Sequence, residues 1–293
     1  MVVTDGIDAA SVTLHNGKSH RNLVMNDTLS SDPENSGRLR PFAEILVSLG
    51  FLTRVPIPFL RTIDPPPLAQ SMRFFGIAGG IIGALNGLVL VGLDWLHVPH
   101  MMAAVLACAS GLIVTGALHE DGLSDSADGI FGGSDQQQRL LIMKDSRIGT
   151  FGACALVVAL LLRISAYDVL LQLPDIVIIL VIAAVGAFSR AMVVDMLWAT
   201  RPARSDGLSV LAGRPGRKSA LFAILTAGAF TLYAGAFVRP DTGIIALAMA
   251  GVLTALARRT AIAMIGGQTG DICGAVQVIA ELGMLIGIVA TIG

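Results

Sequence analysis

Seven apolar stretches, each close to the length that crosses a bilayer, limit what this chain can fold into. A membrane span needs about 20 apolar residues, and a helix satisfies its own backbone hydrogen bonds inside hydrocarbon. With 54% hydrophobic and only 14% charged residues, a soluble domain could not hide its apolar surface. We therefore predict an all-α, polytopic integral membrane helix bundle with spans at residues 74–94, 101–118, 149–172, 176–198, 219–238, 242–262 and 272–292.

The N-terminal part of the chain does not fit an ordinary span. Residues 1–40 are polar and lack a basic region followed by an apolar one, so we expect a disordered cytosolic extension without a cleaved signal peptide. Residues 41–293 then form the membrane-embedded domain. Within it, the apolar piece 45–60 is interrupted by Arg54, Pro56 and Pro58, which predicts an interfacial or re-entrant segment.

The basic residues predict the orientation, because Lys and Arg in short loops near helix ends stay on the cytoplasmic side. With the N-terminus in the cytosol, only Arg163, Arg190 and Arg239 fall outside the tail and the cytosolic segments. A net charge of -1 offers no basic surface for nucleic acid. The segments that carry chemistry then share the cytosolic face of the membrane, namely residues 119–148, 199–218 and 263–271.

Three aspartates in one segment predict a cation site. Asp121, Asp125 and Asp128 are spaced i, i+4, i+7, so on a helix they share one face and repel one another unless a cation or a basic ligand lies among them. Hard oxygen donors suit Mg²⁺ or Mn²⁺ with bound phosphates. The structural alternative is a solvated acidic helix end, but carboxylates at a membrane edge are costly and favour a functional site.

Basic residues gather in the next two inner segments. Lys144 and Arg147 stand immediately before a span and can neutralise phosphate oxygens, and Asp145 could ligate the metal or orient Lys144. Positive-inside anchoring is the alternative. The third inner loop adds three charged residues that could gate an anionic substrate or lie beside anionic lipid. They are Arg204, Asp206 and Arg214.

The last inner segment is rich in glycine and leads into a hydrophobic helix. Gly270 and Asp271 stand at the start of this helix, where backbone amides could approach a phosphate, although a tight interhelical turn is equally consistent. Glu281 lies ten residues further on, inside a span, and needs a partner such as Arg190 or His119, or must be protonated.

Two further patterns inside the spans predict packing rather than chemistry. Arg163, in the outer half of its span, is expected to snorkel or pair locally instead of binding substrate. Small residues on a helix face permit close helix contact. The first span carries such a set, Gly76, Gly79, Gly80, Gly83 and Gly87.

Three motifs, together and in this order, resemble the cobalamin synthase family, also called adenosylcobinamide-GDP ribazoletransferase. They are HEDGLSDSADGIFGG at 119–133, IMKDSRIG at 142–149 and TGDICGA at 269–275. FLTRVPIP at 51–58 is similar to the N-terminal signature of the family, and RSDG at 204–207 to a later loop. The resemblance runs from about residue 42 to the end.

The resemblance implies a reaction and its partners. In this family α-ribazole or its 5′-phosphate is joined to adenosylcobinamide-GDP, which gives adenosylcobalamin or its phosphate and releases GMP, with Mg²⁺ as the expected cofactor. The expected partners are these substrates and the lipid bilayer, without nucleic acid, and a homo-oligomer stays open.

The residue roles follow as expectations from that reaction. A ribose hydroxyl would attack the phosphorus next to cobinamide, and either His119 or an ionised Asp would accept the proton. The expected metal ligands are Asp121, Asp125, Asp128 and Asp271, and the expected catalytic residues are His119, Lys144, Asp145 and Arg147. The expected substrate-binding residues are Arg54, Arg190, Arg204, Asp206, Arg214, Gly270 and Glu281.

Two other classes of protein compete with this interpretation. A CDP-alcohol phosphotransferase would require DGxxAR, but Asp121 and Gly122 are followed by Leu-Ser-Asp-Ser. A cation-coupled or proton-coupled transporter could line a pathway with Asp125, Asp128 and Glu281. A transporter should present polar residues to both faces, whereas this chain concentrates them on one.

Overall fold

The computed structural model describes residues 41–57, 65–145 and 147–292. Over these residues the chain folds into helices, and its only β-type pairing is an isolated bridge between Pro202 and Gln268. The predicted cytosolic extension, residues 1–40, lies outside the described part of the chain. The predicted interfacial segment, 45–60, overlaps helix α1, Pro41–Leu52, and its last residues, 58–60, lie outside the described part.

Six helices are long and apolar enough to cross a membrane, which confirms the predicted class and most of the predicted spans. The first is a continuous run, Leu68–Trp95, that joins the short helices α2 (Leu68–Ser71) and η2 (Met72–Phe74) to α3 (Phe75–Trp95). The others are α7 (Thr150–Leu170), α8 (Asp175–Ala199), α10 (Arg217–Ala236), α11 (Thr242–Ile265) and α12 (Gly270–Val289).

The predicted span 101–118 is divided in the structure. Helix α4, His100–Thr115, has 16 residues and is followed by Gly116 and Ala117, both in the left-handed conformation at φ 66° and 54°. This pair ends α4, because left-handed residues cannot continue a right-handed helix. The chain then turns by 91° into α5, Leu118–Gly132, and only α4 and α5 together would count as a seventh span.

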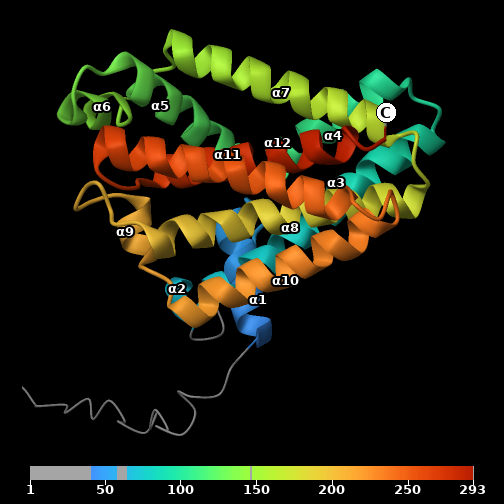
Figure 1. The fold of residues 1–293 in the computed structure, drawn as a ribbon, viewed down its shortest axis with the longest axis horizontal. Coiled ribbons are helices and arrows are strands. Elements are labelled where there is room, and N and C mark those ends of the chain that lie inside the picture. The colour runs from blue at the N-terminus through green and yellow to red at the C-terminus, as the bar shows by residue number, and fades with distance from the viewer. Residues whose placement is uncertain (1–40, 58–64, 146, 293) are drawn as a thin grey trace, which may run out of the picture. The chain divides into compact units, whose positions relative to one another are not determined.

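The polar segments gather at one end of the bundle. Helix α5, the short helix α6 (Gln136–Ile142) and the short helix α9 (Leu208–Ala212) lie together at the left of Figure 1. The connections at the other end, between α3 and α4, α7 and α8, and α10 and α11, span only a few residues. The side chains with predicted chemistry therefore lie mainly at one end, as alternating spans require.

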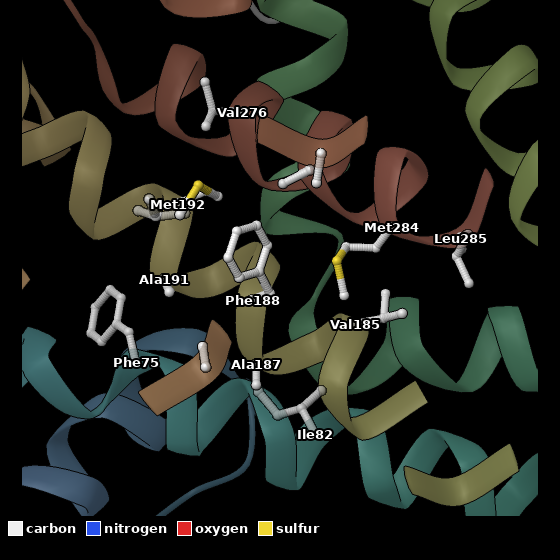
Figure 2. Packing of buried hydrophobic residues seen from close by; sticks show 14 of the residues in the cluster. Phe75, Ile82, Val185, Ala187, Phe188, Ala191, Met192, Val276, Met284 and Leu285 are labelled. Carbon is white, nitrogen blue, oxygen red and sulfur yellow. The ribbon is translucent and has the colours of Figure 1, made fainter. Parts of the chain in front are cut away.

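Helix α8 forms the centre of the bundle. Of its most apolar 18-residue window, 83% is buried, against 22% for α11, so α8 is enclosed by other helices while α11 exposes most of its surface. Figure 2 shows Val185, Ala187 and Phe188 of α8 between Ile82 of α3 and Met284 of α12. This packed core supports the end of the bundle at which the polar segments gather.

The glycines of α3 confirm the predicted close helix contact. A Cβ on Gly79 or Gly83 would collide with backbone carbonyl oxygens of α8, at Gly186 and Ile182 respectively. Gly186 makes the reciprocal approach to Gly79. In a membrane, where burial of apolar area drives helix association weakly, such backbone proximity is a main source of packing energy.

We predict that Gly83→Ala destabilises the protein by about 1–3 kcal/mol, because the added methyl group overpacks the crossing of α3 and α8. The thermal unfolding midpoint in detergent measures this effect. Gly92→Ala is the matched control, since Gly92 lies on the same helix and a Cβ there meets nothing within 4 Å. Equal midpoints for the two variants would show that the crossing does not depend on glycine.

Candidate functional site

Helix α5 crosses α12 at two glycines, and this crossing brings together carboxylates that are distant in sequence. A Cβ on Gly122 would lie 2.7 Å from the backbone oxygen of Asp271, and one on Gly274 would lie 3.2 Å from the backbone oxygen of His119. The helices can approach this closely only without side chains at these positions. Asp121 of α5 and Asp271 of α12 consequently line the same cavity.

A backbone bridge adds the loop after α8 to the same place. The amide of Ala203 donates to the carbonyl of Gln268 at 2.8 Å, and the amide of Gln268 donates to the carbonyl of Arg201 at 2.9 Å. The next residue, Thr269, caps α12 by accepting a hydrogen bond from the Ile272 amide at 3.2 Å. The bridge thereby carries Arg204 to the start of α12, where its Nη2 lies 3.5 Å from Oδ2 of Asp271.

The cavity has a volume of about 160 Å³ and a polar side. That side carries His119, Asp121, Arg204, Ser209 and Asp271, while the remaining walls are mostly apolar. Among the described residues, the buried Nε and Nη1 atoms of Arg204 have no hydrogen-bond partner. A partly buried guanidinium with unused donors is suited to bind an anion such as phosphate.

Asp125 lies one turn further along α5, at the edge of this group. Its burial, followed by repulsion from Asp121, Asp271 and Asp128, raises the pKa of the Asp125 carboxyl to about 6. Helix α5 has 15 residues and is not one of the six spanning helices. Burial and the neighbouring carboxylates both disfavour the charged form of Asp125.

Asp128 lies on the same face of α5 as Asp121 and Asp125, but both of its carboxylate oxygens already accept hydrogen bonds. Its two oxygens accept hydrogen bonds from the backbone amides of Gly149 at 2.7 Å and Gly152 at 2.9 Å, at the start of α7. A carboxylate placed there satisfies amides that the helix leaves unpaired and complements the helix dipole. Asp128 therefore joins α5 to α7, and Asp121, Asp125 and Asp271 are the better candidates for a cation.

The donor set fits Mg²⁺ bound together with phosphate. Among the described residues, no three His, Cys, Asp or Glu side chains are arranged to hold a metal ion by themselves. Mg²⁺ normally keeps several waters and is held by one or two carboxylates plus substrate phosphates, so a complete protein cage is not required. Asp121, Asp125 and Asp271 supply hard oxygen atoms beside the anion-binding Arg204.

Lys144, in the predicted catalytic segment, is connected to the site by Asp206, which contacts both Lys144 and Arg204. Lys144 Nζ donates to Oδ2 of Asp206 at 2.7 Å, and this hydrogen bond holds the pKa of the Asp206 carboxyl below its usual range. Asp206 also lies 3.6 Å from Nε of Arg204. By contrast, Asp145 pairs with its neighbour Arg147 at 2.6 Å, and the Arg147 side chain is 87% exposed.

His119 lines the cavity from the first turn of α5 and is 4% exposed. Its burial, together with the positive charges of Arg190 and Arg163, holds the pKa of the imidazole well below its usual range. His119 is therefore neutral at physiological pH and has a free nitrogen that can accept a proton.

Several predicted substrate-binding residues lie away from this cavity. Arg214 donates to the carbonyl of Trp198 at 3.0 Å and so caps the end of α8. Arg54 is exposed, and its backbone amide donates to the carbonyl of Val114 at 2.8 Å. Glu281 and Arg190 are buried in the bundle, 3.7 Å apart, so the predicted partner Arg190 does lie beside Glu281.

Of the two alternatives predicted for Arg163, snorkelling is wrong and pairing with neighbouring residues is found. Arg163 is 4% exposed and pairs with two buried carboxylates, Glu120 at 2.9 Å and Glu281 at 2.7 Å. Gln277 donates to the second oxygen of Glu281 at 2.8 Å. The sequence signal for this cluster was the presence of charges inside predicted spans, which favours a specific role over a position at the lipid surface.

The fold and the site define a polytopic membrane protein with a carboxylate-rich cavity, lined also by Arg204, at one end of its bundle. A family model described as cobalamin-5-phosphate synthase matches residues 44–289. The chain belongs to this family and is a membrane-embedded transferase. No solved structure matches it.

Curated relatives named adenosylcobinamide-GDP ribazoletransferase match this chain over nearly their whole length. The protein from Azorhizobium caulinodans is 41% identical over 256 residues, 85% of this chain and 96% of the relative. That from Xanthobacter autotrophicus is 39% identical over 267 residues, 84% of this chain and 95% of the relative. That from Brucella ovis is 39% identical over 250 residues, 83% of this chain and 94% of the relative.

We predict that Arg163→Met destabilises the protein by about 3–5 kcal/mol, because Glu120 and Glu281 would remain buried without their cation. Thermal or denaturant unfolding in detergent measures the loss. The control is Arg239→Met, which removes a largely exposed ion pair with Asp241 and should leave the unfolding midpoint nearly unchanged. Wild-type stability of Arg163→Met would contradict the role of Arg163 as the shared partner.

Proposed function

We propose that the chain transfers the phosphocobinamide group of adenosylcobinamide-GDP to α-ribazole or its 5′-phosphate, with release of GMP, at the cavity between α5 and α12. The observation that supports this proposal most directly is the meeting of Asp121 and Asp271 with the unpaired donors of Arg204. A pyrophosphate needs both a cation and hydrogen-bond donors to neutralise it. The carboxylates of this cavity are suitable ligands for a cation, and Arg204 supplies the hydrogen-bond donors.

The carboxylates and the basic side chains of the site have separate tasks in this reaction. One or two of the carboxylates of Asp121, Asp125 and Asp271 would hold Mg²⁺ together with substrate phosphates, and the ion when bound would neutralise charge on the phosphates. Arg204 donates through Nε and Nη1 to phosphate oxygens, which fixes the donor substrate beside the carboxylates. Lys144 can exchange Asp206 for the departing phosphate of GMP, because both groups are largely exposed, at 48% and 60%.

The acceptor hydroxyl needs a group that takes its proton as the new phosphorus–oxygen bond forms and the bond to GMP breaks. His119 and Asp121 both line the cavity, and either the imidazole or an ionised aspartate would accept the proton; the lowered pKa of His119 makes its imidazole a weak base. The remaining catalysis is positioning and charge neutralisation, which dominate phosphoryl transfer.

We also propose that the site opens to the cytosol across the bacterial inner membrane. The basic residues of the connecting segments lie mainly at the end that carries α5, α6 and α9, and basic loops are retained inside. A cytosolic opening would give the enzyme access to soluble nucleotide substrates. Cysteine labelling in intact cells and in inside-out vesicles tests this orientation.

We predict that Asp125→Asn lowers metal-dependent GMP release on the order of 100-fold while the protein remains folded in the membrane, because a neutral amide is a poor ligand for Mg²⁺. The assay supplies detergent-solubilised protein with adenosylcobinamide-GDP, α-ribazole or its phosphate, and Mg²⁺. Asp241→Asn is the control, since Asp241 lies in the connection between α10 and α11, at the other end of the bundle.

Two outcomes would count against the proposal. Near-normal turnover by Asp125→Asn would show that the Asp125 carboxylate is not needed for the reaction. Absence of cobalamin product and GMP with well-folded wild-type protein would reject the assigned reaction. Because the assay needs no sealed compartment, activity in detergent also argues against a transporter.

A further inference from the structure

The cavity between α5 and α12 is too small to enclose a nucleoside. Its volume is about 160 Å³, whereas pockets that enclose drug-sized ligands measure roughly 300–1,000 Å³. Its apolar walls add no room, because Leu52, Met72 and Phe75 are at most 1% exposed and belong to the packed core. Both substrates of the proposed reaction carry a nucleoside, so one wall has to move before they reach Asp121 and Asp271.

Most walls of the cavity are held by contacts between helices. Two hydrogen bonds from the Arg73 guanidinium to Glu44, each 2.6 Å long, join η2 to α1. Helices α5 and α12 meet at Gly122 and Gly274, and α3 and α8 cross at their own glycines. Helix α9 lies at the end of the bundle (Figure 1), and among the described residues no hydrogen bond joins it to another helix. Helix α9 is therefore the wall that is free to move.

Glycines in a left-handed conformation stand on both sides of α9. Gly207 precedes the helix at φ 97° and Gly213 follows it at φ 77°, and residues with a side chain rarely adopt such angles. Beyond these glycines the chain is fixed, because Ala203 is paired with the loop before α12 and Arg214 caps the end of α8. Residues 204–213 thus form a segment with a glycine at each end of its helix and a fixed point on each side.

The contacts that hold this segment over the cavity are weak. Lys144 donates to Asp206 at 2.7 Å, but the two side chains are 48% and 60% exposed, so water and salt weaken the pair. Helix α9 turns only the buried Ser209 and Ala212 fully inward, whereas Leu211 is 84% exposed. An exposed ion pair and a small buried area therefore keep α9 in its closed position.

We propose that residues 204–213 are a lid over the site, with Gly207 and Gly213 as its hinges. The pair of Lys144 with Asp206 is the latch that keeps the lid closed. When the pair separates, α9 moves away from α12 and opens the cavity to substrates and products. This inference goes beyond the proposed function and rests on it only for the identity of the molecules that pass.

The lid carries part of the site and responds to phosphate. Arg204 and Ser209 both line the cavity, so closing the lid brings their donors to bound substrate and opening withdraws them. A phosphate that binds Lys144 competes with Asp206 for the same ammonium group and so releases the latch. The departing nucleotide thereby favours the open form and its own release.

The first test ties the lid shut with a disulfide. A Cβ on Gly270, the first residue of α12, would lie 3.3 Å from Cβ of Leu208, close to the Cβ separation of about 3.5–4.5 Å in disulfides. We expect the oxidised variant Leu208→Cys/Gly270→Cys to lose GMP release on the order of 100-fold relative to its reduced form. Leu208→Cys alone is the control and should release GMP equally fast oxidised and reduced. Undiminished GMP release by protein that mass spectrometry shows to be cross-linked would overturn the inference.

The second test uses a native cysteine and needs no turnover. Cys273 of α12 lines the cavity and is 6% exposed, so opening of the lid should speed its reaction with a maleimide. We expect Asp206→Asn, which removes the latch, to raise the rate of Cys273 labelling about threefold to fivefold, the size expected for an exposed ion pair. Asp241→Asn, which alters an ion pair at the other end of the bundle, should leave the rate unchanged.

Equal labelling rates in Asp206→Asn and the wild type would overturn the inference, and mass spectrometry of the Cys273 peptide measures both rates. Because labelling is independent of the reaction, this test decides the inference even if the double cysteine variant fails to fold. Failure of the proposed transfer would be seen separately, as absence of GMP release by the wild-type protein.

Discussion

The cluster of Arg163 with Glu120 and Glu281 holds the polar end of the molecule together. Helix α5 is short and polar, so burial of apolar surface alone cannot keep it against the bundle. Arg163 of α7 pairs with Glu120 of α5 and Glu281 of α12 in surroundings that exclude water, where opposite charges attract strongly and an unpaired charge is very unfavourable. The cluster thus fixes one arrangement of three helices.

From that arrangement the site follows through three different contacts. Gly122 and Gly274 let α5 and α12 touch, the backbone bridge at Gln268 brings in the loop with Arg204, and Asp128 anchors the start of α7. None of these contacts belongs to the reactive groups themselves. The site is therefore supported from outside, which leaves Asp121, Asp125 and Asp271 available to a cation and substrate.

The resulting cavity has two chemical halves because it lies where spanning helices meet connecting segments. Spanning helices and the adjoining α1 and η2 supply apolar walls such as Leu52, Phe75 and Leu197, while α5, the loop after α8 and the start of α12 supply the charges. A soluble fold would have to build both halves inside its own core.

The sequence by itself determined the class, most of the spans and the family, because hydropathy and ordered motifs are properties of consecutive residues. It also predicted Asp121, Asp125, Asp128 and Asp271 as ligands of a cation, which stays a prediction. Only the tertiary structure decided that Asp128 is engaged by α7, that α4 ends at Gly116, and that Arg163 is a buried partner of two glutamates. Those outcomes depend on backbone conformation and on contacts between helices distant in sequence, which no local pattern of residues specifies.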